Sequence, residues 1–148
     1  LSTEAVDWLV QQILGNEGEV FYTMVERSVM ERRFPNSRRT YAHLKGLEVC
    51  GGDVFGIHLD LVRTPKPIWQ RLVETRKSPL RQAALFGFDT MFLLMLRQLS
   101  LEEAEKMVAQ RLGGSGRALL TPYAEMAMDV DKPHQLEILR NDLSARSG

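Results

Sequence analysis

Apolar residues recur at helical spacing over much of this chain. In residues 1–15 they fall three or four positions apart, after the N-cap residues Ser2 and Thr3 and before the stop signal Gly15-Asn16. The same spacing predicts a second helix from Glu19 to Arg33, which Pro35 ends. Ser37 is expected to cap a short third helix that carries Tyr41, Leu44 and Leu47.

Residues 49–63 are ambiguous. Ile57, Leu59 and Leu61 alternate with His58 and Asp60, a period of two that is typical of a half-buried strand. The sequence offers no evident partner strand, and a lone strand cannot form a sheet. We therefore predict helical or irregular structure in this stretch.

The downstream half contains clear start signals for helices. Residues 91–96 are apolar on every side, which predicts a central, buried helix over 88–99. Ser100 and Glu103 form a capping box for a helix over 101–112. Thr64-Pro65, Ser78-Pro79, Thr121-Pro122 and Pro133 favour further helix starts, and another is expected over Arg117–Leu120.

These patterns predict an all-α fold, a compact single-domain bundle of about seven or eight helices with one central apolar helix (88–99). With 44% hydrophobic and 26% charged residues, the 148-residue chain is not disordered. A single cysteine excludes an intramolecular disulfide, and the six-residue run at 91–96 is too short to span a membrane. Because the first residue is leucine, we expect this domain (1–148) to be excised from a longer chain.

The charges cancel overall but are unevenly distributed. Residues 26–81 contain twelve basic and six acidic residues, and the rest contains seven basic and thirteen acidic ones. Fourteen of the nineteen basic residues are arginines, whose planar guanidinium suits carboxylate and phosphate recognition. The densest group, with two aromatic neighbours, is the candidate partner-binding set: Arg32, Arg33, Arg38, Arg39, Phe34 and Tyr41. Alternatively, these arginines pair with the acidic half inside the fold.

No catalytic, metal or cofactor site is predicted. His43, Cys50, His58 and Asp60 match no paired-ligand spacing for zinc. Cys50 has histidines nearby but no marked oxyanion hole or orienting acid, and whether its thiol is reactive is left open. The glycine-rich loop at 113–117 lacks the Lys-Ser/Thr of a Walker loop and the preceding strand of a dinucleotide loop.

These observations favour a non-enzymatic protein-interaction domain, an adaptor or regulatory module. It would dock a protein partner, or a second copy of itself, through the arginine-rich face and an apolar helical surface. The alternative is a nucleic-acid-binding helical domain that uses the same arginines. Either function implies an intracellular location, cytoplasmic or nuclear. No segment matches a family motif well enough to name a family.

Overall fold

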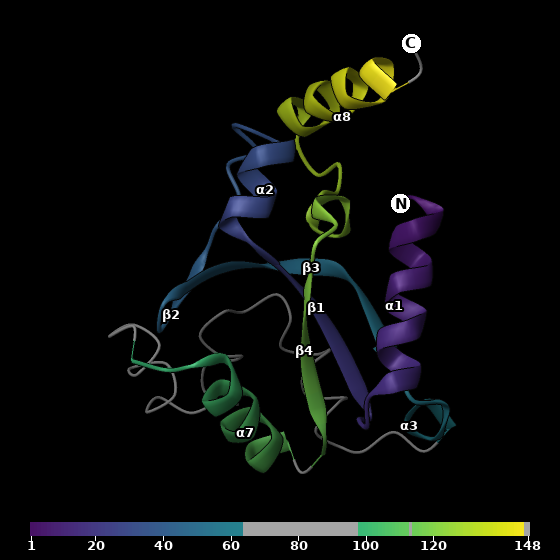
Figure 1. Cartoon of the computed structure of the whole chain (residues 1–148), viewed down its shortest axis with the longest axis vertical. Helices are drawn as coiled ribbons and strands as arrows, with labels where there is room; N and C mark the ends of the chain where they lie inside the picture. The colour runs from purple at the N-terminus through teal and green to yellow at the C-terminus, as the bar shows by residue number, and fades with distance from the viewer. Residues whose placement is uncertain (64–97, 113, 147–148) are drawn as a thin grey trace.

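A four-stranded mixed sheet lies at the centre of the computed structural model, which describes residues 1–63, 98–112 and 114–146 (Figure 1). The strand order is β2-β3-β1-β4. Strand β1 pairs antiparallel with β3 and parallel with β4, and β2 pairs antiparallel with β3. The bounds are β1 Val20–Glu26, β2 Ala42–Leu44, β3 Leu47–Ile57 and β4 Gly116–Thr121.

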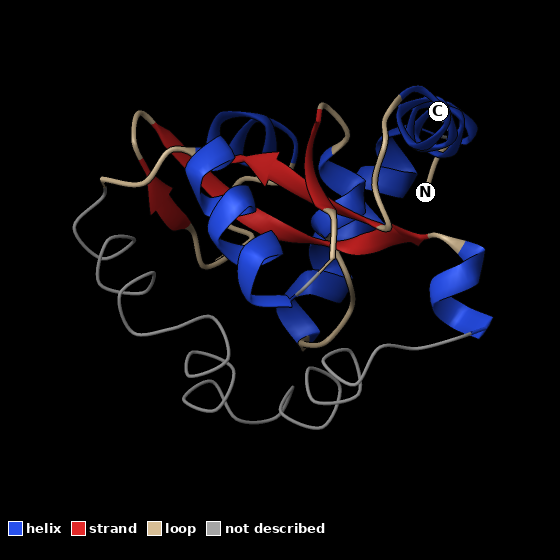
Figure 2. Ribbon diagram, turned by 90° about the horizontal axis from the view of Figure 1, so that it is seen from below, coloured by secondary structure: helices blue, strands red, loops and turns tan. Residues whose placement is uncertain are grey.

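Helices lie on both sides of this sheet (Figure 2). Within the described residues they are α1 Thr3–Gly15, α2 Arg27–Arg33, α3 Leu59–Arg63, α7 Leu101–Leu112, α8 Pro133–Arg146 and the 3-10 helix η1 Ala124–Ala127. Helix α8 lies beside α2 at one end of the molecule (Figure 1). None of the described helices is both long and apolar enough to cross a membrane.

The sheet divides the apolar core into two layers. Neighbouring strand residues point to opposite faces, so Met24 and Val25 of β1 belong to different clusters. Val25 packs with Met30 and Phe34 beneath α2, η1 and α8, and a neighbouring cluster fills the space beneath α1. Met24 packs on the other face with Leu44, Val49, Leu99 and residues of α7.

The all-α prediction is wrong, and β1 shows why. The chain from Glu19 to Arg33 forms a strand followed by a short helix rather than one helix. Val20, Phe21, Met24 and Val25 fit a helical stripe, but the residues that point into one core layer are Phe21, Thr23 and Val25. The polar Thr23 at the middle of this alternation concealed the period of two.

Two further stretches predicted as helix form strands. The third expected helix contains β2 and the start of β3, and Arg117–Leu120 lies in β4. Residues 49–57 of the ambiguous stretch, predicted as helical or irregular, belong to β3, which pairs along one side with β1 and at one end with β2. The alternation of Ile57 to Leu61 did not mark this strand, because Leu59–Arg63 forms helix α3. The partner strands β1 and β2 lie in segments that were themselves predicted as helices.

Three helices were predicted correctly from local signals. They are α1 with its Ser2 cap, α7 with the reciprocal Ser100–Glu103 capping box, and α8 after Pro133. The helices expected between 64 and 97, including most of the central helix 88–99, lie outside the described residues, while residues 98–100 are not helical. The single domain over 1–148 and the intracellular location stay predictions.

Candidate functional site

A partly buried guanidinium joins three distant segments of the chain. Arg39 Nη1 lies 3.2 Å from Asp129 Oδ1, Arg39 Nη2 donates a hydrogen bond to the Gly51 carbonyl at 3.0 Å, and the same nitrogen lies 3.7 Å from Asp53 Oδ2. We call these four residues the Arg39 cluster. The side chains of Asp53 and Asp129 remain 42% and 34% exposed, so their free oxygen lone pairs can reach a ligand.

An irregularity in β3 sets the place of Asp53. Tyr22 pairs with Phe55 and Met24 with Gly51, so Thr23 alone lies opposite the three residues 52–54. Such a bulge re-aims side chains and is common beside active sites. Thr23 Oγ1 donates a hydrogen bond to the Val54 carbonyl, which holds the bulged segment to β1.

The loop between α2 and β2 holds Arg39 in a constrained backbone. Asn36 and Arg38 have positive φ angles of 65° and 56°, a conformation uncommon for residues other than glycine. Ser37 between them is buried, and its carbonyl oxygen lies 3.4 Å from His134 Nε2 of α8. Strained conformations of this kind persist where the surrounding structure holds them, often at functional sites.

Burial is the largest influence on the pKa of Asp53 in the Arg39 cluster, and the charge of Arg39 is the next largest. Burial raises the pKa of Asp53, Arg39 opposes that rise, and Asp129 and Asp131 add to it. Burial also raises the pKa of the Tyr22 phenol, and Asp53 adds to this shift. A carboxyl group with a raised pKa is better suited to accept a proton near neutral pH than an ordinary aspartate.

Cys50 lies in the core beneath this site. Its side chain is 1% exposed and contacts the Val25 carbonyl at 3.6 Å. Burial raises the pKa of the thiol, with Arg39 opposing the shift. Because the thiolate is the nucleophilic form, this environment favours a packing role for Cys50.

The candidate partner-binding residues do not form one outward face. Arg33 pairs with Glu125 and with Asp142, and Arg39 belongs to the cluster described above. Phe34 is fully buried. Tyr41 donates a hydrogen bond to Glu31, and burial together with this bond raises the pKa of Tyr41 to about 12.

Only two of the six candidates, Arg32 and Arg38, are exposed. The alternative that we left open, pairing of arginines with the chain's own carboxylates, therefore describes Arg33 and Arg39. Partner binding by the six residues stays a prediction, and Arg32 and Arg38 are the two that are exposed to a partner.

The two histidines considered as zinc ligands each lie beside a carboxylate instead. His43 Nδ1 lies 2.6 Å from Glu48 Oε1, and His58 pairs with Asp60 at 3.4 Å on the surface. Within the described ranges, no group of three or more His, Cys, Asp or Glu residues is arranged to hold a metal ion.

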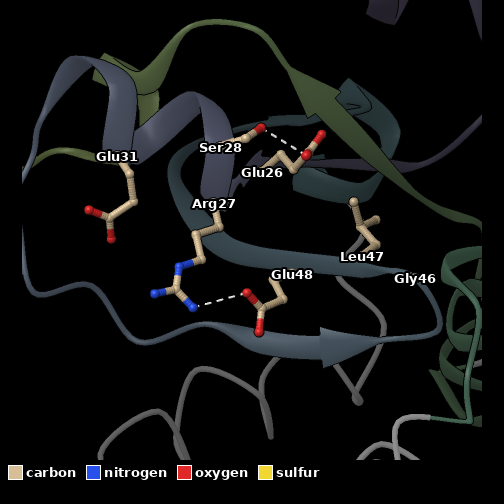
Figure 3. Close-up of a pocket in the computed structure, with 7 residues that line it drawn as sticks. All are labelled: Glu26, Arg27, Ser28, Glu31, Gly46, Leu47 and Glu48. Carbon is tan, nitrogen blue, oxygen red and sulfur yellow. Dashed lines mark hydrogen bonds and ion pairs between the residues drawn. The ribbon is translucent and has the colours of Figure 1, made fainter.

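A separate open pocket of about 400 Å³ lies between α2 and the β2–β3 turn (Figure 3). Arg27 points across it to Glu48, with 3.0 Å between Nη1 and Oε2, and Ser28 donates a hydrogen bond to Glu26. Glu31 at its rim accepts the hydrogen bond from Tyr41. The Arg39 cluster is the better candidate site, because it brings together partly exposed carboxylates from distant segments beside the β-bulge.

Sequence reasoning singled out Arg39 but missed Asp53 and Asp129. Their signals were weak: a Gly-Gly step before Asp53, and the acidic pair Asp129 and Asp131 just before a helix start. Neither signal predicts that these segments meet, because the meeting depends on the β3 bulge and on the path through η1.

Comparison with known proteins gives one informative match. No family model matches the chain, and no curated protein does. A solved structure described as a hypothetical transferase from Thermus thermophilus matches with a TM-score of 0.83 and 38% sequence identity. The match covers 92% of this chain, which spans 58% of the length of that one. The name of this structural neighbour points to an enzyme and conflicts with the non-enzymatic function predicted from the sequence.

Proposed function

We propose that this chain is part of a transferase and that the Arg39 cluster lies in its active site. The observation that carries the proposal is the match to the hypothetical transferase, at 38% identity across nearly the whole chain. The geometry adds a place for the chemistry: two partly exposed carboxylates held by one guanidinium beside a β-bulge.

The chemistry of the cluster indicates how a substrate would bind. Both ends of the Arg39 guanidinium are occupied by Asp129, Asp53 and the Gly51 carbonyl, so Arg39 orients the carboxylates rather than binding an anion. The remaining carboxylate lone pairs accept hydrogen bonds from hydroxyl or amine groups. Asp53 would bind the acceptor and take its proton as the acceptor forms a bond to the transferred group, while the bond between that group and the donor breaks and the rest of the donor leaves with the bonding electron pair.

The test measures donor consumption by the protein that its complete gene encodes. Four donor classes are supplied separately with a small-metabolite extract as the source of acceptors: nucleoside triphosphates with Mg²⁺, UDP-glucose, acetyl-CoA and S-adenosylmethionine. Consumption is followed by mass spectrometry. We expect wild type to consume one class and Asp53→Asn to be slower by about 100-fold, the usual contribution of a general base.

Asp7→Asn provides the matched control. Asp7 is exposed on α1, outside the Arg39 cluster, and this variant should keep the wild-type rate. If the wild type consumes no donor, or if Asp53→Asn stays within threefold of the wild-type rate, the proposed function is overturned.

A further inference from the structure

Among the residues that the structure describes, helix α8 makes few apolar contacts with the rest of the protein. Among its described side chains only Gln135 is fully buried, at 5% exposed. Ile138 and Leu139 are partly buried against the cluster around Met30 and Phe34. Elements with so little buried apolar surface belong to the least stable part of a fold and open locally.

A charged network also attaches α8 to the protein. Asp142 of α8 accepts two hydrogen bonds from Arg33 of α2, at 3.4 Å from Nε and 3.3 Å from Nη2. Arg33 Nη1 also donates to Glu125 of η1, and Glu125 accepts a hydrogen bond from Ser2 at the start of α1. We call Ser2, Arg33, Glu125 and Asp142 the Arg33 network.

The first turn of α8 fixes the segment that follows the site carboxylate Asp129. Gln135 Oε1 accepts hydrogen bonds from the backbone nitrogens of Asp131 and Lys132, at 3.0 and 2.8 Å. His134 Nε2 lies 3.4 Å from the carbonyl oxygen of Ser37, in the loop that holds Arg39. A displacement of α8 therefore pulls on both partners of the Arg39–Asp129 ion pair.

We propose that α8 is a detachable clamp that controls the Arg39 cluster. When the Arg33 network holds α8 in place, residues 129–132 are fixed and Asp129 stays on Arg39. When Asp142 leaves Arg33, α8 and residues 129–132 open together. The regulatory meaning of this coupling rests on the proposed function, whereas the coupling itself does not.

Hydrogen–deuterium exchange of the chain, read by mass spectrometry, tests the coupling. Asp142→Asn removes the charge that Arg33 binds. Because a hydrogen bond to a charged group contributes about 1.5 kcal/mol, exchange over 133–146 should quicken about tenfold. The same factor is expected over 129–132, with β1 and β3 unchanged.

Two variants of α8 serve as comparisons. Glu137→Gln removes an exposed negative charge from the same helix, outside the Arg33 network, and should leave exchange unchanged. Asp142→Glu keeps the charge and should stay within about threefold of wild type. Salt at 1 M should reproduce part of the Asp142→Asn effect, since it screens the partly exposed pair.

Three results would overturn the clamp: unchanged exchange over 133–146 in Asp142→Asn, quicker exchange there with residues 129–132 at the wild-type rate, or an equal rise in β1 and β3. The last would mean that the variant opens globally. Exchange requires no substrate, so an active Asp53→Asn variant would refute the proposed function and leave this result intact.

Discussion

Arg33→Ala should lower the free energy of unfolding by about 3 kcal/mol, because it leaves a buried carboxylate without its counter-charge. The Glu125 side chain is 9% exposed and that of Asp142 is 18% exposed, and both pair with Arg33. Urea denaturation followed by circular dichroism measures the loss. The Arg33 guanidinium also lies over the Phe34 ring. Lost packing on this ring therefore accounts for part of the effect, and the unpaired carboxylate accounts for the rest.

Arg32→Ala is the matched control for this prediction. Arg32 is the neighbouring residue of the same helix and is exposed, so its removal should change stability by less than about 0.5 kcal/mol. The double variant Arg33→Ala/Glu125→Gln should recover part of the loss, since a neutral amide costs less to bury than a lone carboxylate. Equal stability of Arg33→Ala and Arg32→Ala would show that the Arg33 network does not hold the helices together.

Gly52→Ala should cost about 3 kcal/mol of stability through overpacking at the β-bulge. A Cβ at this position would overlap with Thr23 Oγ1 and would lie 2.9 Å from the backbone oxygen of Thr23. A side chain can turn away, but the backbone of a central strand cannot. The substitution should therefore also disturb the neighbouring Asp53.

The control for the glycine prediction is Gly15→Ala. A Cβ at Gly15, at the end of α1, meets no atom within 4 Å, so this variant should unfold close to the wild-type urea concentration. If Gly52→Ala unfolds at the same concentration as Gly15→Ala, the close approach of β1 and β3 at Thr23 is wrong.

Local signals in the sequence predicted α1, α7 and α8 because their caps lie within a few residues of the helices. The sheet could not be predicted in this way. Its centre depends on the pairing of Val20 with Gly116 and of Val25 with Cys50, which are far apart in the chain. Without those partners, β1 and β4 fit helical spacing as well as strand spacing.

The candidate site, like the fold, could be predicted from the sequence only in part. The run of arginines made Arg33 and Arg39 candidate partner-binding residues, but the sequence does not say whether a guanidinium points outward or to a carboxylate of its own chain. Arg39 meets Asp53 only because β3 bulges opposite Thr23, and Asp129 only because the chain returns through η1. Those are properties of the assembled sheet.

The role of Asp53 is tested most directly by the pH dependence of kcat/KM for the acceptor substrate, measured in wild type and in Arg39→Gln. Arg39 opposes the rise in the Asp53 pKa, so its removal should raise that pKa further. We expect the acidic limb of the profile to move to higher pH in Arg39→Gln than in wild type. An acidic limb at the same pH in both proteins would contradict an active-site carboxylate held by Arg39.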